Sequence, residues 1–244
     1  MSVVLEKWIH DNLILIPGGN EIMRHFYDEQ KWISSNSKMS VPGRRNDLTE
    51  TQSIIEIKPF SLFRFPVTDD LFHFVTGASE NIRDTGIPAV NVSWNDAIRF
   101  CNALSVLVGR KPYYTFDRYT EEVSCHPESE GFRLPTEAEW QYACHAGSHP
   151  YQYGNIHEIA WFDTNSNHQI QAVGKKAPNE WDLYNMLGNV WEWCWDLYDE
   201  KRYDTYRSFR GGSWAGTERV CGATCRRKGH PSFKIDDLGF RIAK

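Results

Sequence analysis

The feature that most constrains the fold is a set of three short motifs in the C-terminal part of the chain. They are Asn185-Met-Leu-Gly-Asn-Val-Trp-Glu-Trp193, Arg210-Gly-Gly-Ser-Trp214 and Leu238-Gly-Phe-Arg241. Ordinary cores are built mainly from aliphatic side chains, so this density of glycine, tryptophan and charged residues is unusual. Glycine is needed where the backbone turns tightly or approaches another segment. The motifs therefore indicate a fold with closely packed, irregular backbone.

Composition and charge narrow the class of protein. The chain has 244 residues, of which 41% are hydrophobic, and a formal net charge of −5. No apolar run approaches the ~18–20 residues that a membrane-spanning helix needs. The N-terminus is interrupted by charges and does not resemble a signal peptide. We therefore expect a single domain over residues 1–244, located in the cytoplasm and without a membrane contact.

The one basic cluster is Arg226-Arg-Lys228. Three basic residues are too few to indicate a nucleic-acid surface, and the acidic and basic residues elsewhere are interspersed. We expect this cluster to be a solvated turn, and we expect no nucleic-acid partner.

Local patterns predict the elements of the N-terminal half. Leu13–Ile16 is expected to be a strand that ends in the turn Pro17-Gly-Gly19, and the next thirty polar residues are expected to be a long loop. Residues 54–65 favour a strand, which Pro59 confines to an edge or a bulge. Thr68 is expected to cap a short helix through Ala78.

Two further helix starts are well marked. Ser93 opens a helix with apolar residues at 3- and 4-residue spacing, and Gly109 ends it. Thr136-Glu-Ala-Glu139 is a capping box, in which the hydroxyl accepts from a backbone amide and Glu139 reaches back to the cap. That helix is expected to run to about Ala146 and to stop at Gly147. Beyond it we expect only short strands.

Together with Gly131-Phe-Arg-Leu-Pro-Thr-Glu-Ala-Glu-Trp140, the three motifs closely resemble the formylglycine-generating enzyme (sulfatase-modifying factor) family. Several unlinked segments occur in the family's order, among them Pro88-Ala-Val-Asn-Val-Ser-Trp94. The resemblance implies an α+β domain with the C-type-lectin-like fold of that family, low in regular secondary structure. Such a fold hosts unrelated functions, so the function has to be argued from the site.

The first motif is a candidate calcium site. Calcium prefers carboxylate, amide and backbone carbonyl oxygens, and the spacing N-x-x-G-x-V-x-E offers all three. The alternative is a capped turn with Glu192 in a hydrogen-bonded network. The resemblance implies a structural calcium held by Asn185, Gly188, Val190 and Glu192. The family's second calcium pattern is missing from the loop 160–173, so one calcium ion is expected.

The second candidate site is a pair of cysteines. By resemblance, the family's catalysts oxidise a peptide cysteine with molecular oxygen and a copper(I) ion held by two cysteines, and soft thiolates suit copper(I). Cys221 stands at the family's position, seven residues after Trp214. Cys225 follows after four residues where the family has five, and the flanking pattern differs. In a strand, a separation of four keeps both side chains on one face; the alternative is that the two thiols only pack.

Two hypotheses about function follow from the resemblance. The first is an oxygen-dependent oxidase or oxygenase, a metal-dependent oxidoreductase acting on a peptide cysteine or a small thiol. Cys221 and Cys225 would then be catalytic and hold copper, and Ser213 and Trp214 would line the substrate site. The second is a non-catalytic binding or accessory module on the same fold, which acts through a protein partner.

The other cysteines have structural interpretations. We expect Cys101 to face a helix core, Cys144 and Cys194 to be packed, and Cys125 to lie in a polar loop. All six should mostly be free thiols, because no export signal is present.

Three further residues, His145, His149 and Arg241, are candidates for chemistry. His145 and His149 are four residues apart, but Gly147 between them argues against a pair of helical metal ligands, so we expect surface histidines. Arg241 is expected to be a buried hydrogen-bonding anchor, not a catalytic group.

Overall fold

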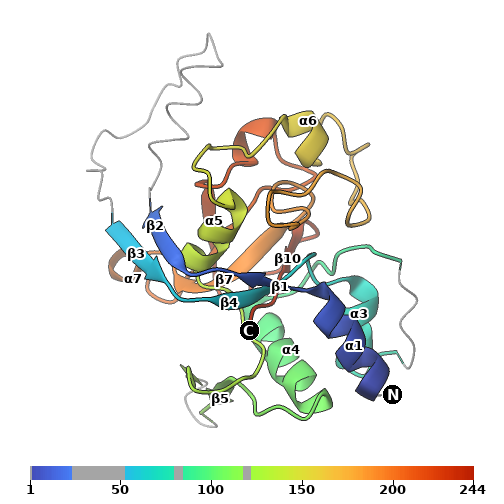
Figure 1. The fold of residues 1–244 in the computed structure, drawn as a ribbon, viewed down its shortest axis with the longest axis vertical. Helices are drawn as coiled ribbons and strands as arrows, with labels where there is room; N and C mark the ends of the chain where they lie inside the picture. Colours follow the sequence, from blue (N-terminus) through green and yellow to red (C-terminus); the bar gives the residue numbers. More distant parts are fainter. Residues whose placement is uncertain (1, 24–52, 80–84, 118–121) are drawn as a thin grey trace.

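A computed structural model describes residues 2–23, 53–79, 85–117 and 122–244 of the chain (Figure 1). The helices of this part are α1 (Ser2–Asn12), α3 (Asp69–Val75), α4 (Trp94–Leu107), α5 (Glu137–His145), α6 (Ile156–Ile159), α7 (Glu200–Tyr203) and the 3₁₀ turn η1 (Glu218–Val220). The strands are β1 (Leu13–Ile16), β2 (Gly19–Met23), β3 (Ser53–Ile57), β4 (Phe60–Phe63), β5 (Tyr114–Phe116), β6 (Val123–Cys125), β7 (Trp191–Leu197), β8 (Arg207–Arg210), β9 (Arg226–Gly229) and β10 (Leu238–Phe240). This mixture of short elements confirms the predicted α+β class.

The strands form one four-stranded sheet and three two-stranded ones. The larger sheet has the order β10-β7-β8-β9, and the pairs are β1-β4, β2-β3 and β5-β6. β10 runs parallel to β7, whereas the other pairs are antiparallel. In Figure 1, α5 and α6 lie on one side of the central strands and α1, α3 and α4 lie on the other. The three sequence motifs contribute to or border the larger sheet.

The helix starts follow the sequence closely. Ser93 and Thr136 both form complete capping boxes, with Asp96 and Glu139 as the returning carboxylates. α5 ends at a left-handed Ala146, one residue before the predicted Gly147. Local side-chain to backbone bonds define these boundaries, which is why the sequence alone locates them.

Some predicted elements were wrong in detail. The strand expected over residues 54–65 is two strands, because the chain breaks at Pro59, which has no amide to donate to a ladder. Residues 19–23 are not loop but strand β2, paired with β3. The helix from Thr68 ends at Val75 rather than at Ala78. The rest of the predicted polar loop falls within residues 24–52, which lie outside the described residues.

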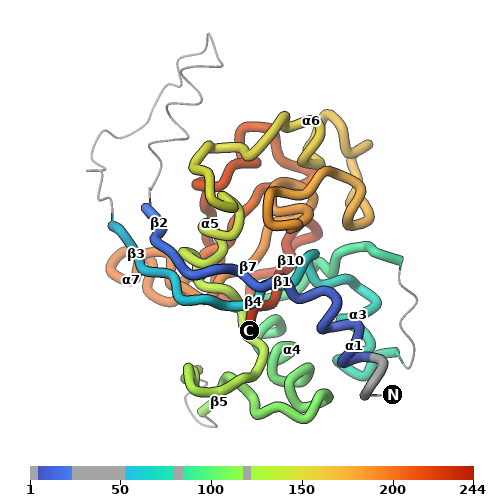
Figure 2. The backbone as a smooth tube through the Cα atoms, in the orientation of Figure 1, coloured from blue at the N-terminus to red at the C-terminus, as the bar shows by residue number. Residues whose placement is uncertain are grey.

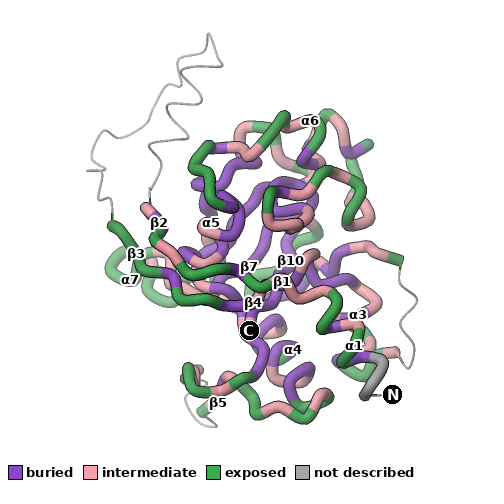
Figure 3. The backbone as a smooth tube through the Cα atoms, viewed as in Figure 1, coloured by how far each residue is buried: buried purple, intermediate pink, exposed green. Residues whose placement is uncertain are grey.

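The end of the chain ties the N-terminal strands to the core. Lys244 and Ser61 exchange two backbone hydrogen bonds, and the Phe63 amide donates to the carbonyl of Ile242. The C-terminus accordingly lies beside β4 in the tube view (Figure 2). Burial is concentrated on α5, β7 and β10, which run through the centre of the molecule (Figure 3).

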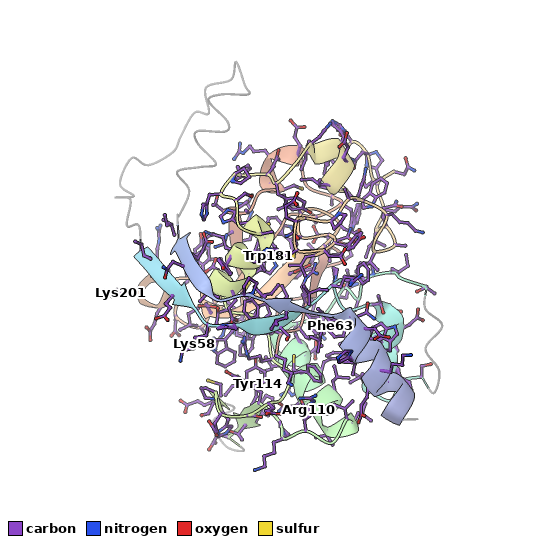
Figure 4. All side chains as sticks on the ribbon, viewed as in Figure 1. Lys58, Phe63, Arg110, Tyr114, Trp181 and Lys201 are labelled. Carbon is purple, nitrogen blue, oxygen red and sulfur yellow. The ribbon has the colours of Figure 1, made fainter. Side chains whose placement is uncertain are left out.

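Aromatic rings fill the spaces between the short elements. Trp181, from the irregular segment before β7, contacts the ring of Tyr142 on α5 with centroids 5.0 Å apart, and Phe63 on β4 contacts Trp8 on α1 at 5.7 Å (Figure 4). The hydroxyl of Tyr114 accepts from the amide of Leu134. Large rings therefore link loops and strands where regular structure is scarce. Among the described helices, none is long and apolar enough to span a membrane.

Candidate functional site

The three sequence motifs meet around the larger sheet. Glu192 on β7 is opposite Arg210 on β8 and also opposite Gly239 on β10. The loop before β7 reaches β8, because the amide of Gly188 donates to the carbonyl of Gly211. Segments far apart in sequence thus form one continuous structure.

A buried ion pair joins the first motif to the last. Arg241 donates from Nε and Nη2 to the two carboxylate oxygens of Glu192, at 3.1 and 2.9 Å. Trp140 donates its indole N–H to the same carboxylate at 2.7 Å. Arg241 also donates to the carbonyls of Phe63, Arg64 and Tyr184 and is 0% exposed. Arg241 is therefore the buried anchor that the sequence predicted.

A second buried network lies next to the first. Glu137, at the start of α5, accepts from Arg210 at 2.6 Å and from two guanidinium nitrogens of Arg226. The hydroxyl of Ser208 also donates to Glu137, at 3.0 Å. The prediction of a solvated turn at residues 226–228 was wrong, because these residues begin strand β9. Arg226 is buried, and its guanidinium neutralises the buried carboxylate of Glu137.

Near these networks Asp196 has an unusual environment. Its carboxylate accepts from the backbone amide of Glu137 at 2.6 Å. Desolvation, followed by the negative charge of Glu137, raises the pKa of Asp196 to about 6. Close to neutral pH this group changes its charge, whereas an ordinary aspartate stays ionised.

The predicted calcium ligands have other partners. The carboxylate of Glu192 is neutralised by Arg241, and the side-chain oxygen of Asn185 accepts from the amide of Gly174 at 3.0 Å. The atom of Asn185 that is buried without a partner among the described residues is its Nδ2, a donor, which cannot bind a cation. The side chains of Asn185 and Glu192 therefore favour the alternative interpretation, a turn with Glu192 in a hydrogen-bonded network.

The two cysteines lie in a turn and not in a strand. Cys221 directly follows η1, and Cys225 precedes β9, so the two side chains do not share a strand face, and that expectation was wrong. Cys221 is 0% exposed and Cys225 is 3% exposed. Burial, and then the charge of Cys225, raises the pKa of the Cys221 thiol well above its ordinary value. The Sγ of Cys221 faces the carbonyl of Thr217 at 3.9 Å.

Ser213 and Trp214, which were predicted to line the substrate site, both form hydrogen bonds within the protein. Ser213 is buried and donates its hydroxyl to Asp237 at 2.6 Å. Trp214 is half-buried, and its backbone carbonyl accepts from Ser166 at 3.0 Å. The indole N–H of Trp214 is buried and has no partner among the described residues. Of these two residues, Trp214 therefore has a hydrogen-bond donor, its indole N–H, without an acceptor among the described residues.

The remaining cysteine predictions are mostly confirmed. Cys101, Cys144 and Cys194 are buried. Cys125 was expected in a polar loop, but it ends strand β6 and is half-buried. All six cysteines are free thiols, as expected.

One cluster was missed by the sequence analysis. His145 is buried and not a surface residue, and its Nδ1 lies 3.1 and 3.2 Å from the carboxylate oxygens of Glu21 on β2. His149 lies beside Glu21 and His145. One possible ligand atom from each of the three residues lies within 4.8 Å of the other two. Residues 21 and 145 are 124 positions apart, and no local spacing reveals such a contact.

The pKa of Glu21 reflects this environment. Burial raises it, but hydrogen bonds from His145 and Gln141 and the charges of the two histidines outweigh burial and hold the pKa below its ordinary value. Glu21 is therefore a carboxylate at neutral pH.

Known proteins resemble the chain over most of its length. A "Chaperone protein LppX" of Paenibacillus barcinonensis is 28% identical over an alignment of 228 residues, which covers 78% of this chain and 81% of that protein. An "Inactive C-alpha-formylglycine-generating enzyme 2" of Bos taurus is 29% identical over 75% of this chain, which spans 58% of that protein. Among solved structures, "Treponema denticola variable protein 1" matches with a TM-score of 0.78 and 26% identity, covering 95% of this chain and 94% of that one.

The same family is indicated by a comparison of the whole chain with family models. The family described as "Sulfatase-modifying factor enzyme 1-like domain" matches residues 6–244. Since that match includes all three motifs and the networks built from them, the chain belongs to the sulfatase-modifying factor family, the family of the formylglycine-generating enzymes.

Proposed function

We propose that this protein is a non-catalytic member of its family, which acts as a binding or accessory module for a protein partner. The observation that carries the proposal is the burial of Cys221 and Cys225. Copper(I) binding and thiol oxidation both need a thiolate, and desolvation disfavours the thiolate of Cys221. The names of two relatives, an inactive enzyme and a chaperone, support the same conclusion.

The charged motif residues also support a scaffold role. Arg210, Arg226 and Arg241 are all buried and paired with Glu137 or Glu192. A buried pair with additional hydrogen bonds fixes the positions of the segments that it joins. In this interpretation the motifs define the fold, and the surface around them carries the function.

A cleft suited to a peptide segment supports the proposal as well. It measures about 880 Å³ and lies between α1, β1 and the loops that follow α4. Its walls combine charged groups of both signs with apolar side chains, the mixture found at non-obligate interfaces. Leu15 on β1 lines it and is 74% exposed. Its lining also includes Lys7, Ile9, Arg110, Glu130 and Phe132.

Copper(I) titration in competition with a chelator tests the proposal directly. We expect no stoichiometric complex, and we expect Cys221→Ser to leave the titration unchanged. In the native protein, a thiol reagent should modify Cys125 first, so Cys125→Ser is the matched control for accessibility. A tight one-to-one complex that Cys221→Ser abolishes would disprove the proposal.

The cleft has a separate test. Peptides selected from a display library on the whole protein should lose binding when a charge is placed in the cleft by Leu15→Glu. Ile54→Glu, at a residue 73% exposed on β3 and away from the cleft, is the matched control and should keep binding. Equal binding by both variants would place the binding surface elsewhere.

The second candidate function is oxygen-dependent oxidation of a peptide cysteine or a small thiol. One observation favours it: the two cysteines are close enough for the charge of Cys225 to affect the pKa of Cys221. Copper(I) bound by these two thiolates would supply the activation of oxygen. Oxygen uptake in the presence of copper and a cysteine peptide, lost in Cys225→Ser, would support this function over the first.

Calcium at the first motif was expected from the resemblance, whereas the contacts of Glu192 and Asn185 argue against it. Because Arg241 already neutralises the only carboxylate of the set, we expect added calcium to leave the thermal midpoint unchanged within about 1 °C. A midpoint that rises with calcium in the wild type and not in Asn185→Ala would instead confirm the site. Magnesium is the control for a general effect of divalent ions.

A further inference from the structure

The buried carboxylates of this protein are compensated in two different ways. Glu137, Glu192 and Glu21 are 4%, 1% and 0% exposed. The first two pair with arginine. Among the described residues, Glu21 has no arginine or lysine partner and instead faces an imidazole and the amide of Gln141. A fully buried carboxylate without a permanent cation is costly, so this environment is unusual.

The end of α5 brings a second imidazole to the same place. Ala146 and Gly147 both have positive φ, of 47° and 84°, and turn the chain back on itself. Ser148 holds this turn, because its amide and its hydroxyl both donate to the carbonyl of His145. The ring of His149 consequently stands 5.3 Å from that of His145, at an interplanar angle of 75°.

We propose that Glu21, His145 and His149 bind a divalent transition-metal ion of the zinc type. Two imidazole nitrogens and a carboxylate oxygen are a donor set that zinc uses with a fourth position left open. Ligand atoms at about 2.0–2.2 Å from a tetrahedral ion lie about 3.4 Å apart. The three ligand atoms already lie within 4.8 Å of one another, and a small movement of the exposed His149 closes the remaining gap.

The surroundings hold the ligands in place. The Nε2 of Gln141 donates to Glu21 at 2.9 Å and to the carbonyl of Ile22 at 3.1 Å, while its Oε1 accepts from Arg210. Hydrogen bonds of this kind orient metal ligands and are part of the affinity of a site. His149 lies at the surface, so an ion can enter from solvent and the open position can take water or an oxygen atom of a partner.

Titration of the full chain, prepared without a polyhistidine tag, tests the site. Calorimetry with zinc should give one ion per chain, and cobalt should give the visible d–d absorption of a four-coordinate ion. His149→Ala should weaken binding roughly tenfold or more, which corresponds to about 1.4 kcal/mol. His10→Ala is the control, because the side chain of His10 is 90% exposed and lines the cleft beside α1, outside the cluster.

The outcomes separate the metal site from a simple hydrogen-bonded pair. Because His149 is exposed, its replacement should leave the metal-free thermal midpoint unchanged, and a loss of cobalt absorption then reports on ligation. Glu21→Gln should also abolish the absorption. Absence of binding in the wild type, or binding that His149→Ala leaves intact, would overturn the proposal. Cys221→Ser should bind zinc normally, since the site does not involve the cysteine pair.

Discussion

Glu192 illustrates how a residue of a family motif serves the scaffold. Its two oxygens accept from Arg241 and Trp140, so the carboxylate joins β7 to α5 and to the residue that follows β10. The sequence located Glu192 and Arg241 as important positions. It did not say that they contact each other, because 49 residues separate them and no local rule links them.

Breaking this pair from one side should be costly. Arg241→Met leaves Glu192 as an unpaired buried charge, so we expect the free energy of unfolding to fall by about 3–5 kcal/mol. Urea unfolding measures this loss of unfolding free energy. The control is Arg227→Met, because Arg227 is an exposed residue of β9. The double variant Glu192→Gln/Arg241→Met should recover part of the loss, and a double variant as unstable as Arg241→Met would contradict the charge argument.

Asp196 gives the stability a defined pH dependence. Its folded pKa of about 6 lies above the ordinary 3.8, so the folded state binds the proton more tightly than the unfolded chain. The contribution of Asp196 is therefore complete below about pH 4 and is lost as the pH rises through about 6. Asp196→Asn cannot ionise and should gain roughly 1–2 kcal/mol relative to the wild type between about pH 4.5 and 7.5.

Urea unfolding of the wild type and of Asp196→Asn, at about pH 4.5 and at about pH 7.5, measures this gain in unfolding free energy. Asp204→Asn is the control, since Asp204 is exposed and asparagine has nearly the same side-chain shape. A difference between the wild type and Asp196→Asn that does not change with pH would show that Asp196 titrates normally.

At the scale of elements, α5 organises the core. It carries Glu137 at its first turn, Trp140 and Gln141 in its middle and His145 at its end. The capping box at Thr136 predicted where this helix starts. The sequence could not predict that its buried face includes Glu137, Gln141 and His145, because the carboxylate and the arginines that pair with them come from β2, β8 and β9.

The loop before β7 depends on a close approach of two backbones. A Cβ at Gly188 would lie 2.3 Å from the carbonyl oxygen of Trp161, whereas Gly109 has the same φ of +71° with nothing within 4 Å. Gly109→Ala should therefore cost only the left-handed strain, about 1 kcal/mol. Gly188→Ala should cost about 1–3 kcal/mol more, because the backbone has to move apart. Thermal unfolding measures both, and equal losses would contradict the close approach.

For the whole molecule, contacts between distant segments join the two ends of the chain. β10 pairs in parallel with β7, and the last residues pair with β4. A single domain over residues 1–244 stays a prediction. We expect calorimetry to show one transition with equal calorimetric and van't Hoff enthalpies. Two resolved transitions would show that part of the chain unfolds independently.

By itself the sequence determined the family, the α+β class, the capped starts of α3, α4 and α5, and the anchor role of Arg241. These follow from motifs and from bonds between residues a few positions apart. The tertiary structure alone decided that Cys221 and Cys225 are buried, that Arg226 neutralises Glu137, and that Glu21 meets His145. The physical reason is that burial and charge compensation depend on contacts across many tens of residues, which residue spacing does not encode.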